Sequence, residues 1–368
     1  ERSARFKGRG LRVFGSPSRY LQGPGAIDAM GPYVEHLGAN AVLVADRAVL
    51  GLIATRVQAV CKAAGVHCTP LEFSGEITPQ EVARLTGEAR GHKPAFVIGA
   101  GGGKGIDAGK GVANGLGLPV VTIPTAASND APTSKLYVLY DEHHRVLRVE
   151  HMRSNPHVVV VDTTVIAKAP VHLFTAGIGD AIVKKFEVAQ CTGAGGTNLF
   201  GASACLAAQA LADLCYSTLR ERGKGALESV KRGIANEDVE QVVEATVLHS
   251  GLGFESGGLS VSHAMTRGLT AVRGARDALH GHQVAYALLV QLTLEGRSES
   301  FIADVMAFYR DTELPLCLAD LGLTRPTTDE IQAISEGTMT AAYIKNFQRP
   351  LAAPDIAEAI CAVEGGNR

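Results

Sequence analysis

The sequence predicts an α/β domain built on a parallel sheet, followed by an all-α domain. In the first half of the chain, short β-branched runs alternate with helical stretches, which is typical of a parallel sheet covered on both faces. Beyond Pro170 such runs become rare, and apolar residues recur at the three- and four-residue spacing of amphipathic helices. The length of 368 residues, too great for one ordinary core, favours two domains.

Four buried strands are expected in the first half. Each is a continuous apolar run of strand length, and the runs cover residues 41–45, 95–100, 120–123 and 158–161. The first leads into a helical stretch over residues 49–64, and the second leads into glycines and a helix from Ile106 onward. This alternation predicts a Rossmann-like sheet.

The second half is expected to be helical, with amphipathic patterns over residues 201–220 and 238–252. Because the composition changes near residues 168–172, we place the two domains at residues 1–169 and 170–368. A cleft between two domains is the default location for a catalytic site.

The composition excludes several classes of protein. A hydrophobic fraction of 46% argues against a disordered chain, and a net charge of -2 argues against a nucleic-acid partner, which needs a concentrated basic face. No apolar run approaches the ~20 residues of a membrane span, and the basic start over residues 1–12 lacks a signal-peptide core, so we expect a surface tail there. The seven cysteines form no CxxC pair, which favours a cytoplasmic location.

A glycine-rich segment, residues 99–107 (GAGGGKGID), lies between an expected strand and an expected helix. Backbone N–H groups at such a junction can close on a phosphate, aided by the helix dipole. Two better-known phosphate-binding patterns do not match this segment. GxGxxG would need glycine at position 104, which is Lys104. GxxxxGK[ST] would need glycine at position 98, which is Ile98, and serine or threonine at position 105, which is Gly105. The spacing alone predicts a generic phosphate cradle or a flexible turn, and Lys104 and Asp107 favour the cradle.

Two further polar positions follow expected strands. Asp46 ends the first strand, where an acidic residue either accepts from ribose hydroxyls or caps the next helix, and the sequence leaves both roles open. The loop over residues 123–134 carries Thr125, Ser128, Asp130 and Ser134. These groups either bind a polar ligand or serve as ordinary turn residues.

Three candidate metal ligands lie in the helical half: Asp180, at an expected helix start among small residues, His263 and His280. A lone histidine in an apolar helix is more often a core residue than a ligand. Two imidazoles and a carboxylate, each beside glycine or alanine, suit Zn²⁺ with one position open for substrate. His249 and His282 remain alternative ligands.

Six motifs together resemble one known family. They are GGGKGID (101–107), PTAASNDAP (124–132), NPHVVVVD (155–162), AGIGDA (176–181), GFESGGLSVSHAMTRGLTA (253–271) and HGHQVA (280–285). The chain resembles the glycerol dehydrogenases of the iron-containing alcohol dehydrogenase superfamily from about Ser16 to at least Val290. The resemblance implies the two-domain architecture shared with dehydroquinate synthase, and a homo-oligomer, commonly an octamer.

The resemblance also implies roles for individual residues. Asp180, His263 and His280 match the zinc ligands, and Asp130 matches the residue that holds a glycerol hydroxyl; these four form the expected catalytic set. The residues expected to bind NAD are Asp46, Gly103, Lys104, Gly105, Ile106, Asp107, Thr125, Ser128, Ser134, Leu136 and Tyr140.

The chain departs from the family pattern at four positions. Gly105 and Asn129 stand where threonine is usual, and His282 replaces a frequent glutamate, which puts another imidazole near the expected metal. Lys184 lies one helical turn after Asp180, where iron-using relatives carry a further histidine. This last departure favours zinc with three protein ligands over iron with four.

The implied activity is the NAD- and zinc-dependent oxidation of glycerol and other vicinal diols, with dihydroxyacetone as the product from glycerol. A glycerol-1-phosphate dehydrogenase is one alternative, and Arg267, Arg273 and Lys184 would then supply the grip on the phosphate. A second alternative is a lyase like dehydroquinate synthase, and a third is a catalytically silent binding module. The expected partner is a small polyol, with neither nucleic acid nor membrane.

Overall fold

The computed structural model describes residues 10–142 and 146–366. The chain divides into two compact units. An α/β unit comprises Gly15–Val171 and Glu228–Val247, and a helical unit comprises His172–Leu227, Leu248–Arg368 and the described part of Glu1–Phe14. These units assign residues 10–14 and 228–247 differently from the expected domains at 1–169 and 170–368, which stay a prediction.

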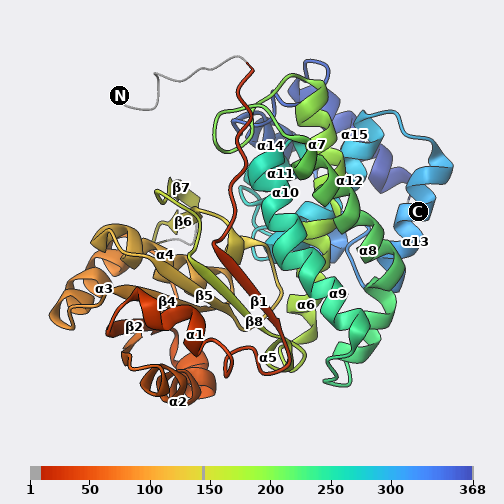
Figure 1. Ribbon diagram of the computed structural model, residues 1–368. Helices are drawn as coiled ribbons and strands as arrows, with labels where there is room; N and C mark the ends of the chain where they lie inside the picture. The colour runs from red at the N-terminus through yellow and green to blue at the C-terminus, as the bar shows by residue number, and fades with distance from the viewer. Residues whose placement is uncertain (1–9, 143–145, 367–368) are drawn as a thin grey trace. The chain divides into compact units, whose positions relative to one another are not determined.

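The α/β unit is built on a six-stranded parallel sheet of order β1-β8-β5-β4-β2-β3 (Figure 1). Its strands are β1 (Arg19–Gly23), β2 (Asn40–Ala45), β3 (His67–Glu72), β4 (Phe96–Gly101), β5 (Val120–Pro124) and β8 (Val158–Asp162). The four expected strands are the four inner ones, β2, β4, β5 and β8, and the expected parallel sheet is confirmed. The two edge strands, β1 and β3, were not predicted from the sequence.

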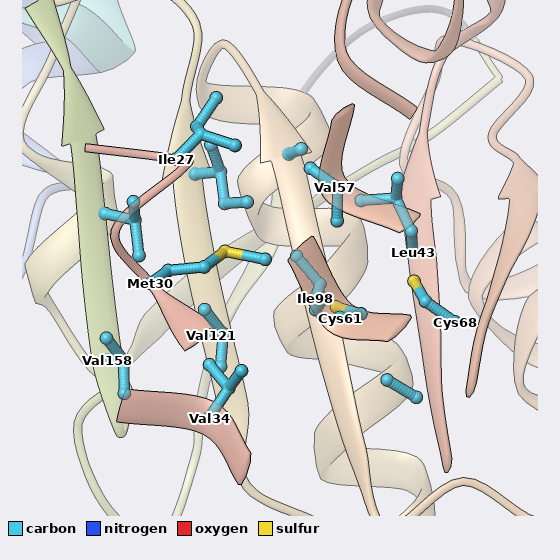
Figure 2. Close-up of a cluster of buried hydrophobic side chains, with 14 of the residues drawn as sticks. Ile27, Met30, Val34, Leu43, Val57, Cys61, Cys68, Ile98, Val121 and Val158 are labelled. Atoms are coloured by element: carbon cyan, nitrogen blue, oxygen red, sulfur yellow. The ribbon is translucent and has the colours of Figure 1, made fainter. Parts of the chain in front are cut away.

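Helices cover both faces of this sheet because successive side chains of a strand point to opposite faces. Leu43 of β2 packs on one face with Val57 of α2 (Arg47–Ala63), and Met30 and Val34 near α1 (Gly31–Val34) join the same cluster (Figure 2). The neighbouring Val42 and Val44 face the other core, beneath α3 (Pro79–Gly91) and α4 (Gly103–Leu116).

Three smaller features complete the α/β unit. An antiparallel hairpin, β6 (Leu136–Tyr140) and β7 (Val146–His151), follows the loop after β5. The short helix α5 (Thr163–Ile166) contacts β8, and α9 (Glu237–Glu244) returns to the sheet edge. There Glu240 accepts hydrogen bonds from Gln22 of β1 and Thr163 of α5.

The helical unit confirms the expected all-α second half. Its helices are α6 (Val171–Ile182), α7 (Lys184–Gly193), α8 (Leu206–Val230), α10 (Ser250–Gly257), α11 (Val261–Leu269), α12 (His280–Leu294), α13 (Glu299–Asp311), α14 (Thr328–Met339) and α15 (Ala353–Gly366). Of the helices in the part of the chain that the structure describes, none combines the length and apolarity that a membrane crossing needs.

Glycines allow two helices of this unit to cross at close range. A Cβ at Gly281 of α12 would collide with the carbonyl oxygen of Ala176 in α6, and a Cβ at Gly179 would lie 3.1 Å from the Ala285 Cβ. Only hydrogen fits at these two positions, so the backbones of α6 and α12 approach closely. The crossing brings Asp180, beside Gly179, toward His280, beside Gly281.

Candidate active site

The expected metal ligands come together in the helical unit. Asp180 lies in the last turn of α6, so the expectation that it begins a helix is wrong; the apolar run before it, from Val171, already belongs to the helix. His263 lies in the first turn of α11, and His280 is the first residue of α12. One ligand atom from each of the three side chains lies within 4.8 Å of the other two.

Asp180 Oδ1 is the common point of this cluster. It lies 3.2 Å from His263 Nε2 and 3.9 Å from His280 Nε2. The Asp180 carboxylate is buried, whereas about half of the His280 side chain (51%) is exposed. The two imidazole rings meet edge to face, with centroids 5.4 Å apart. The three residues therefore present one oxygen and two nitrogens toward a shared point, with access from the side of His280.

Glu187, two helical turns beyond Asp180, orients one of these ligands. Its Oε1 accepts from the backbone N–H groups of Ser260 and His263, both at 2.9 Å, and its Oε2 lies 2.6 Å from His263 Nδ1. The carboxylate thus caps the start of α11 and directs His263 Nε2 toward Asp180. Glu187 was not predicted from the sequence, although its spacing from Asp180 and Lys184 (i, i+4, i+7) in an apolar helical stretch was an available signal.

Lys184 lies inside the same cluster. Its ammonium donates to Asp180 Oδ1 at 2.8 Å and lies 3.1 Å from His263 Nε2. The Lys184 side chain has no exposed surface. Burial alone would raise the pKa of Asp180, but Lys184 and His263 outweigh it and lower this pKa.

The other two histidines considered as ligands stand elsewhere. His282 Nε2 lies 2.9 Å from the hydroxyl of Thr175, on α6. His249 ends a π-helical turn, Ala245–His249, between α9 and α10. Neither belongs to the one cluster of potential metal ligands found among the described residues. The expectation that His282 adds another imidazole near the metal stays a prediction.

In the α/β unit, the glycine-rich segment forms the junction between β4 and α4. Gly102 precedes the first turn of α4 and lacks a side-chain cap, so the N–H groups of that turn point outward at the helix N-terminus. A Cβ at Gly105 would collide with the carbonyl oxygen of Ala100, and one at Gly103 would lie 2.7 Å from the Asn129 amide. The glycines thus let the helix start lie close to the strand and to the next loop.

The side chains in this segment have different surroundings. Lys104 is partly exposed, pairs with Glu76 at 2.7 Å and lies over the ring of Tyr140. Ile106 is buried in the unit's interior. Asp107 is also buried and accepts from the backbone N–H of Val138 at 2.9 Å. Burial raises the pKa of Asp107 to about 6, although Lys110 acts in the opposite direction. Only Lys104 of these three side chains extends to solvent.

The loop after β5 is held by a fully buried lysine on α4. The ammonium of Lys110 donates to the carbonyl oxygens of Ala131 (2.5 Å) and Leu136 (2.6 Å) and to the hydroxyl of Ser134 (3.3 Å). Thr125 begins the loop with a backbone bond to Gly101, and Ser128 accepts from the Asn129 amide. Asp130 and Ser134 are buried, whereas Leu136 and Tyr140 are half-buried on β6.

Asp46 lies at the carboxyl end of β2 and caps α2, accepting from the backbone N–H of Val49 at 3.0 Å. The capping role that the sequence left open is therefore present. The cap uses Oδ1.

Comparison with known proteins identifies the family. Residues 17–163 match the model of the iron-containing alcohol dehydrogenases. A glycolaldehyde reductase of Halobacterium salinarum is 40% identical over 324 residues, which cover 88% of this chain and 89% of that protein. The chain belongs to the iron-containing alcohol dehydrogenase family.

Other relatives place the chain within this family. A glycerol dehydrogenase of Escherichia coli is 38% identical over 88% of this chain and 89% of its own. The crystal structure of glycerol dehydrogenase from Schizosaccharomyces pombe superposes with a TM-score of 0.93 at 34% identity, over 96% of this chain and 91% of that one. The chain is accordingly an NAD-dependent oxidoreductase that resembles the glycerol dehydrogenases, as the sequence motifs predicted.

The donor set fits the metal ion that this iron-containing alcohol dehydrogenase family uses. Ligands at about 2.0–2.1 Å from a tetrahedral ion lie roughly 3.3 Å apart, which matches the 3.2 Å from Asp180 Oδ1 to His263 Nε2, whereas the 3.9 Å to His280 Nε2 is longer. The bond from Glu187 to His263 supplies the carboxylate–histidine pair that accompanies most metal-bound imidazoles. Although burial opposes it, Glu187 raises the pKa of His263 to about 9, so a metal ion would have to replace a proton on Nε2 to bind there.

Proposed function

We propose that this protein oxidises glycerol and other small vicinal diols with NAD and one Zn²⁺ ion, giving dihydroxyacetone from glycerol, NADH and a proton. The observation that carries this proposal is the convergence of Asp180, His263 and His280, with Glu187 behind His263. Two imidazoles and one carboxylate form a set of three protein ligands that leaves a coordination position for substrate. The glycerol dehydrogenases among the relatives favour this substrate class.

In this proposal Asp180, His263 and His280 hold the ion. Bound there, Zn²⁺ would polarise the substrate's hydroxyl group and lower its pKa. Glu187 keeps the proton of His263 on Nδ1, so that Nε2 offers its lone pair. Asp130 fixes a second hydroxyl of the diol.

We propose that NAD is bound by the α/β unit. The backbone N–H groups at Gly103, Lys104 and Gly105 would receive the pyrophosphate at the start of α4. Asp46 would accept hydrogen bonds from the ribose hydroxyls. Ile106 and Asp107 would act from inside the unit by shaping this helix start. The remaining proposed contacts lie on the loop after β5 and on β6: Thr125, Ser128, Ser134, Leu136 and Tyr140.

A second candidate is the reduction of a small hydroxyaldehyde with NADH. The glycolaldehyde reductase at 40% identity favours this direction, and the chemistry is the same hydride transfer run in reverse. A phosphorylated polyol is less well supported, because Lys184, one of the cations available to grip a phosphate, is buried and bonded to Asp180. The lyase alternative predicts no net NADH release.

Three further properties belong to the proposal. All seven cysteines are free thiols, which suits a reducing cytoplasm. We propose that the enzyme is a homo-oligomer, an octamer as in its family. A small polyol is the proposed partner.

The test is NADH formation from glycerol by the purified protein before chelation, after chelation, and after restoration with Zn²⁺ or Fe²⁺. We expect activity to disappear with the chelator and to return with Zn²⁺. Parallel assays with glycolaldehyde and NADH and with a glycerol phosphate compare the candidate substrates. Turnover that survives complete metal removal, or a protein that uses only the phosphorylated substrate, would contradict the proposal.

A further inference from the structure

Lys184 places a buried ammonium group among the proposed metal ligands. Its Nζ lies 2.8 Å from Asp180 Oδ1 and 3.1 Å from His263 Nε2. These are the same oxygen and nitrogen that the ion would use, because Asp180 Oδ1 is the carboxylate oxygen that lies 3.2 Å from His263 Nε2 and 3.9 Å from His280 Nε2. The ammonium and a divalent ion therefore compete for two ligand atoms.

The Lys184 side chain lies entirely in the interior of the helical unit. The side chain starts from the first residue of α7, one helical turn beyond Asp180, and is completely buried. The ammonium is bonded to Asp180, and the carboxylate of Glu187 is engaged with α11 and His263. The ring of Phe254, with its centroid 5.3 Å from Nζ, offers a cation–π contact but no charge. Its burial and its place on α7 put the lysine directly beside the proposed ligands.

We propose that Lys184 sets the metal affinity of this enzyme by competing with the divalent ion for Asp180 and His263. The inference rests on the proposed metal site. Its physical basis is that a buried ammonium repels a nearby divalent cation strongly in a medium of low dielectric constant. A second consequence is that Lys184 stabilises the protein while the ion is absent, since it compensates the buried charge of Asp180.

The test compares two neighbouring lysines. Lys184→Met removes the buried ammonium and keeps most of the side-chain length. Lys185→Met is the matched control, because Lys185 lies next in sequence but pairs with Asp213 (3.0 Å) and is 40% exposed. Chelated wild type and both variants are titrated with Zn²⁺ against a chromophoric competing chelator, which measures affinity without turnover.

We expect Lys184→Met to bind Zn²⁺ at least about tenfold more tightly than the wild type, and Lys185→Met to bind like the wild type. Damage to the fold would weaken binding, so tighter binding separates competition from a merely structural role. The midpoint of thermal unfolding gives a second readout. Chelated Lys184→Met should unfold at a lower temperature than chelated wild type, and Zn²⁺ should raise its midpoint by more.

If Lys184→Met does not fold, Lys184→Gln serves instead, since its amide can still donate to Asp180 without a charge. Equal or weaker Zn²⁺ binding by a folded, neutral variant would overturn the inference and leave the proposed function standing. A wild-type protein that binds no Zn²⁺ at all, together with variants that bind none, would overturn the metal site and the inference with it.

Discussion

At the scale of single residues, the carboxylate of Glu187 has two functions. Its Oε1 accepts from the N–H groups of Ser260 and His263 at the start of α11, and its Oε2 faces His263 Nδ1. In Glu187→Gln the amide oxygen can keep the two backbone bonds. The amide nitrogen would then face Nδ1, so the imidazole must accept there and carry its proton on Nε2.

Glu187→Gln is therefore expected to weaken Zn²⁺ binding by roughly 10- to 100-fold, with a much smaller change in thermal stability. A competition titration with a chelator measures the affinity. Glu295→Gln is the control, because Glu295 follows the far end of α12 and pairs with Arg297. Unchanged affinity in Glu187→Gln would show that this carboxylate does not orient His263.

Asp107 gives a pH dependence that can be measured separately from the metal site. Burial raises its pKa to about 6, so between about pH 4 and pH 6 the folded protein keeps a proton that the unfolded chain releases. The contribution of Asp107 to stability therefore decreases as the pH rises through this range. Asp107→Asn can keep the bond from the Val138 N–H and lacks the titration.

The free energy of unfolding of the wild type, relative to Asp107→Asn, should fall by about 2 kcal/mol between pH 4 and pH 7. Urea unfolding of both proteins at a series of pH values measures this difference. A difference that does not change with pH would mean that folding leaves the pKa of Asp107 unshifted, as for a conventional surface carboxylate.

At the scale of secondary-structure elements, α4 holds the loop after β5 through Lys110. The buried ammonium of this lysine satisfies the carbonyl oxygens of Ala131 and Leu136 on either side of Ser134. Lys110→Met would leave both oxygens without this donor and Asp107 without its nearby cation. We expect a loss of about 3 kcal/mol in the free energy of unfolding.

Because the same loop carries proposed NAD contacts, Lys110→Met should also raise the dissociation constant for NADH, by roughly tenfold or more. NADH fluorescence measures that binding, and urea unfolding measures stability. The exposed Lys62 near the end of α2 supplies the control, Lys62→Met. Native-like stability and NADH binding in Lys110→Met would show that Lys110 does not hold the loop after β5 in place.

The strands that the sequence predicts are more deeply buried than those that it does not. The inner strands β2, β4, β5 and β8 are continuous apolar runs because both of their faces are covered. The edge strands are half-exposed and mix polar with apolar residues, and β3 even contains Pro70, which an edge strand tolerates. Periodicity carries little signal for such strands, and the same is true of β7, which is exposed along most of its length.

The candidate site also contains some residues that the sequence predicts and others that it does not. Asp180, His263 and His280 could be predicted because polar residues among small and apolar neighbours are conspicuous and match a known motif. The role of Glu187 depends on which N–H groups of α11 it meets, and this is decided by how α7 and α11 pack. The interior positions of Ile106 and Asp107 follow in the same way from the packing of α4 on β4. Such contacts between elements cannot be predicted from the local sequence pattern.

At the scale of the whole molecule, the proposed functional groups are divided between the two units. The metal ligands Asp180, His263 and His280 belong to the helical unit, whereas the residues proposed for NAD belong to the α/β unit. Each unit has its own core, so the loss of a metal ligand should not disturb the fold of the other unit. Binding of the nucleotide and binding of the metal should then be separable by mutation.

His263→Ala is expected to lower turnover of glycerol by roughly a thousandfold or more, because several kcal/mol of metal-assisted stabilisation is lost. NADH fluorescence should give a dissociation constant within about twofold of the wild-type value. His282→Ala is the matched control, since His282 bonds to Thr175 and lies outside the metal cluster; it should keep most of the activity. If His263→Ala lost NADH binding together with turnover, the helical unit would contribute to the nucleotide site, and the assignment of NAD to the α/β unit alone would be wrong.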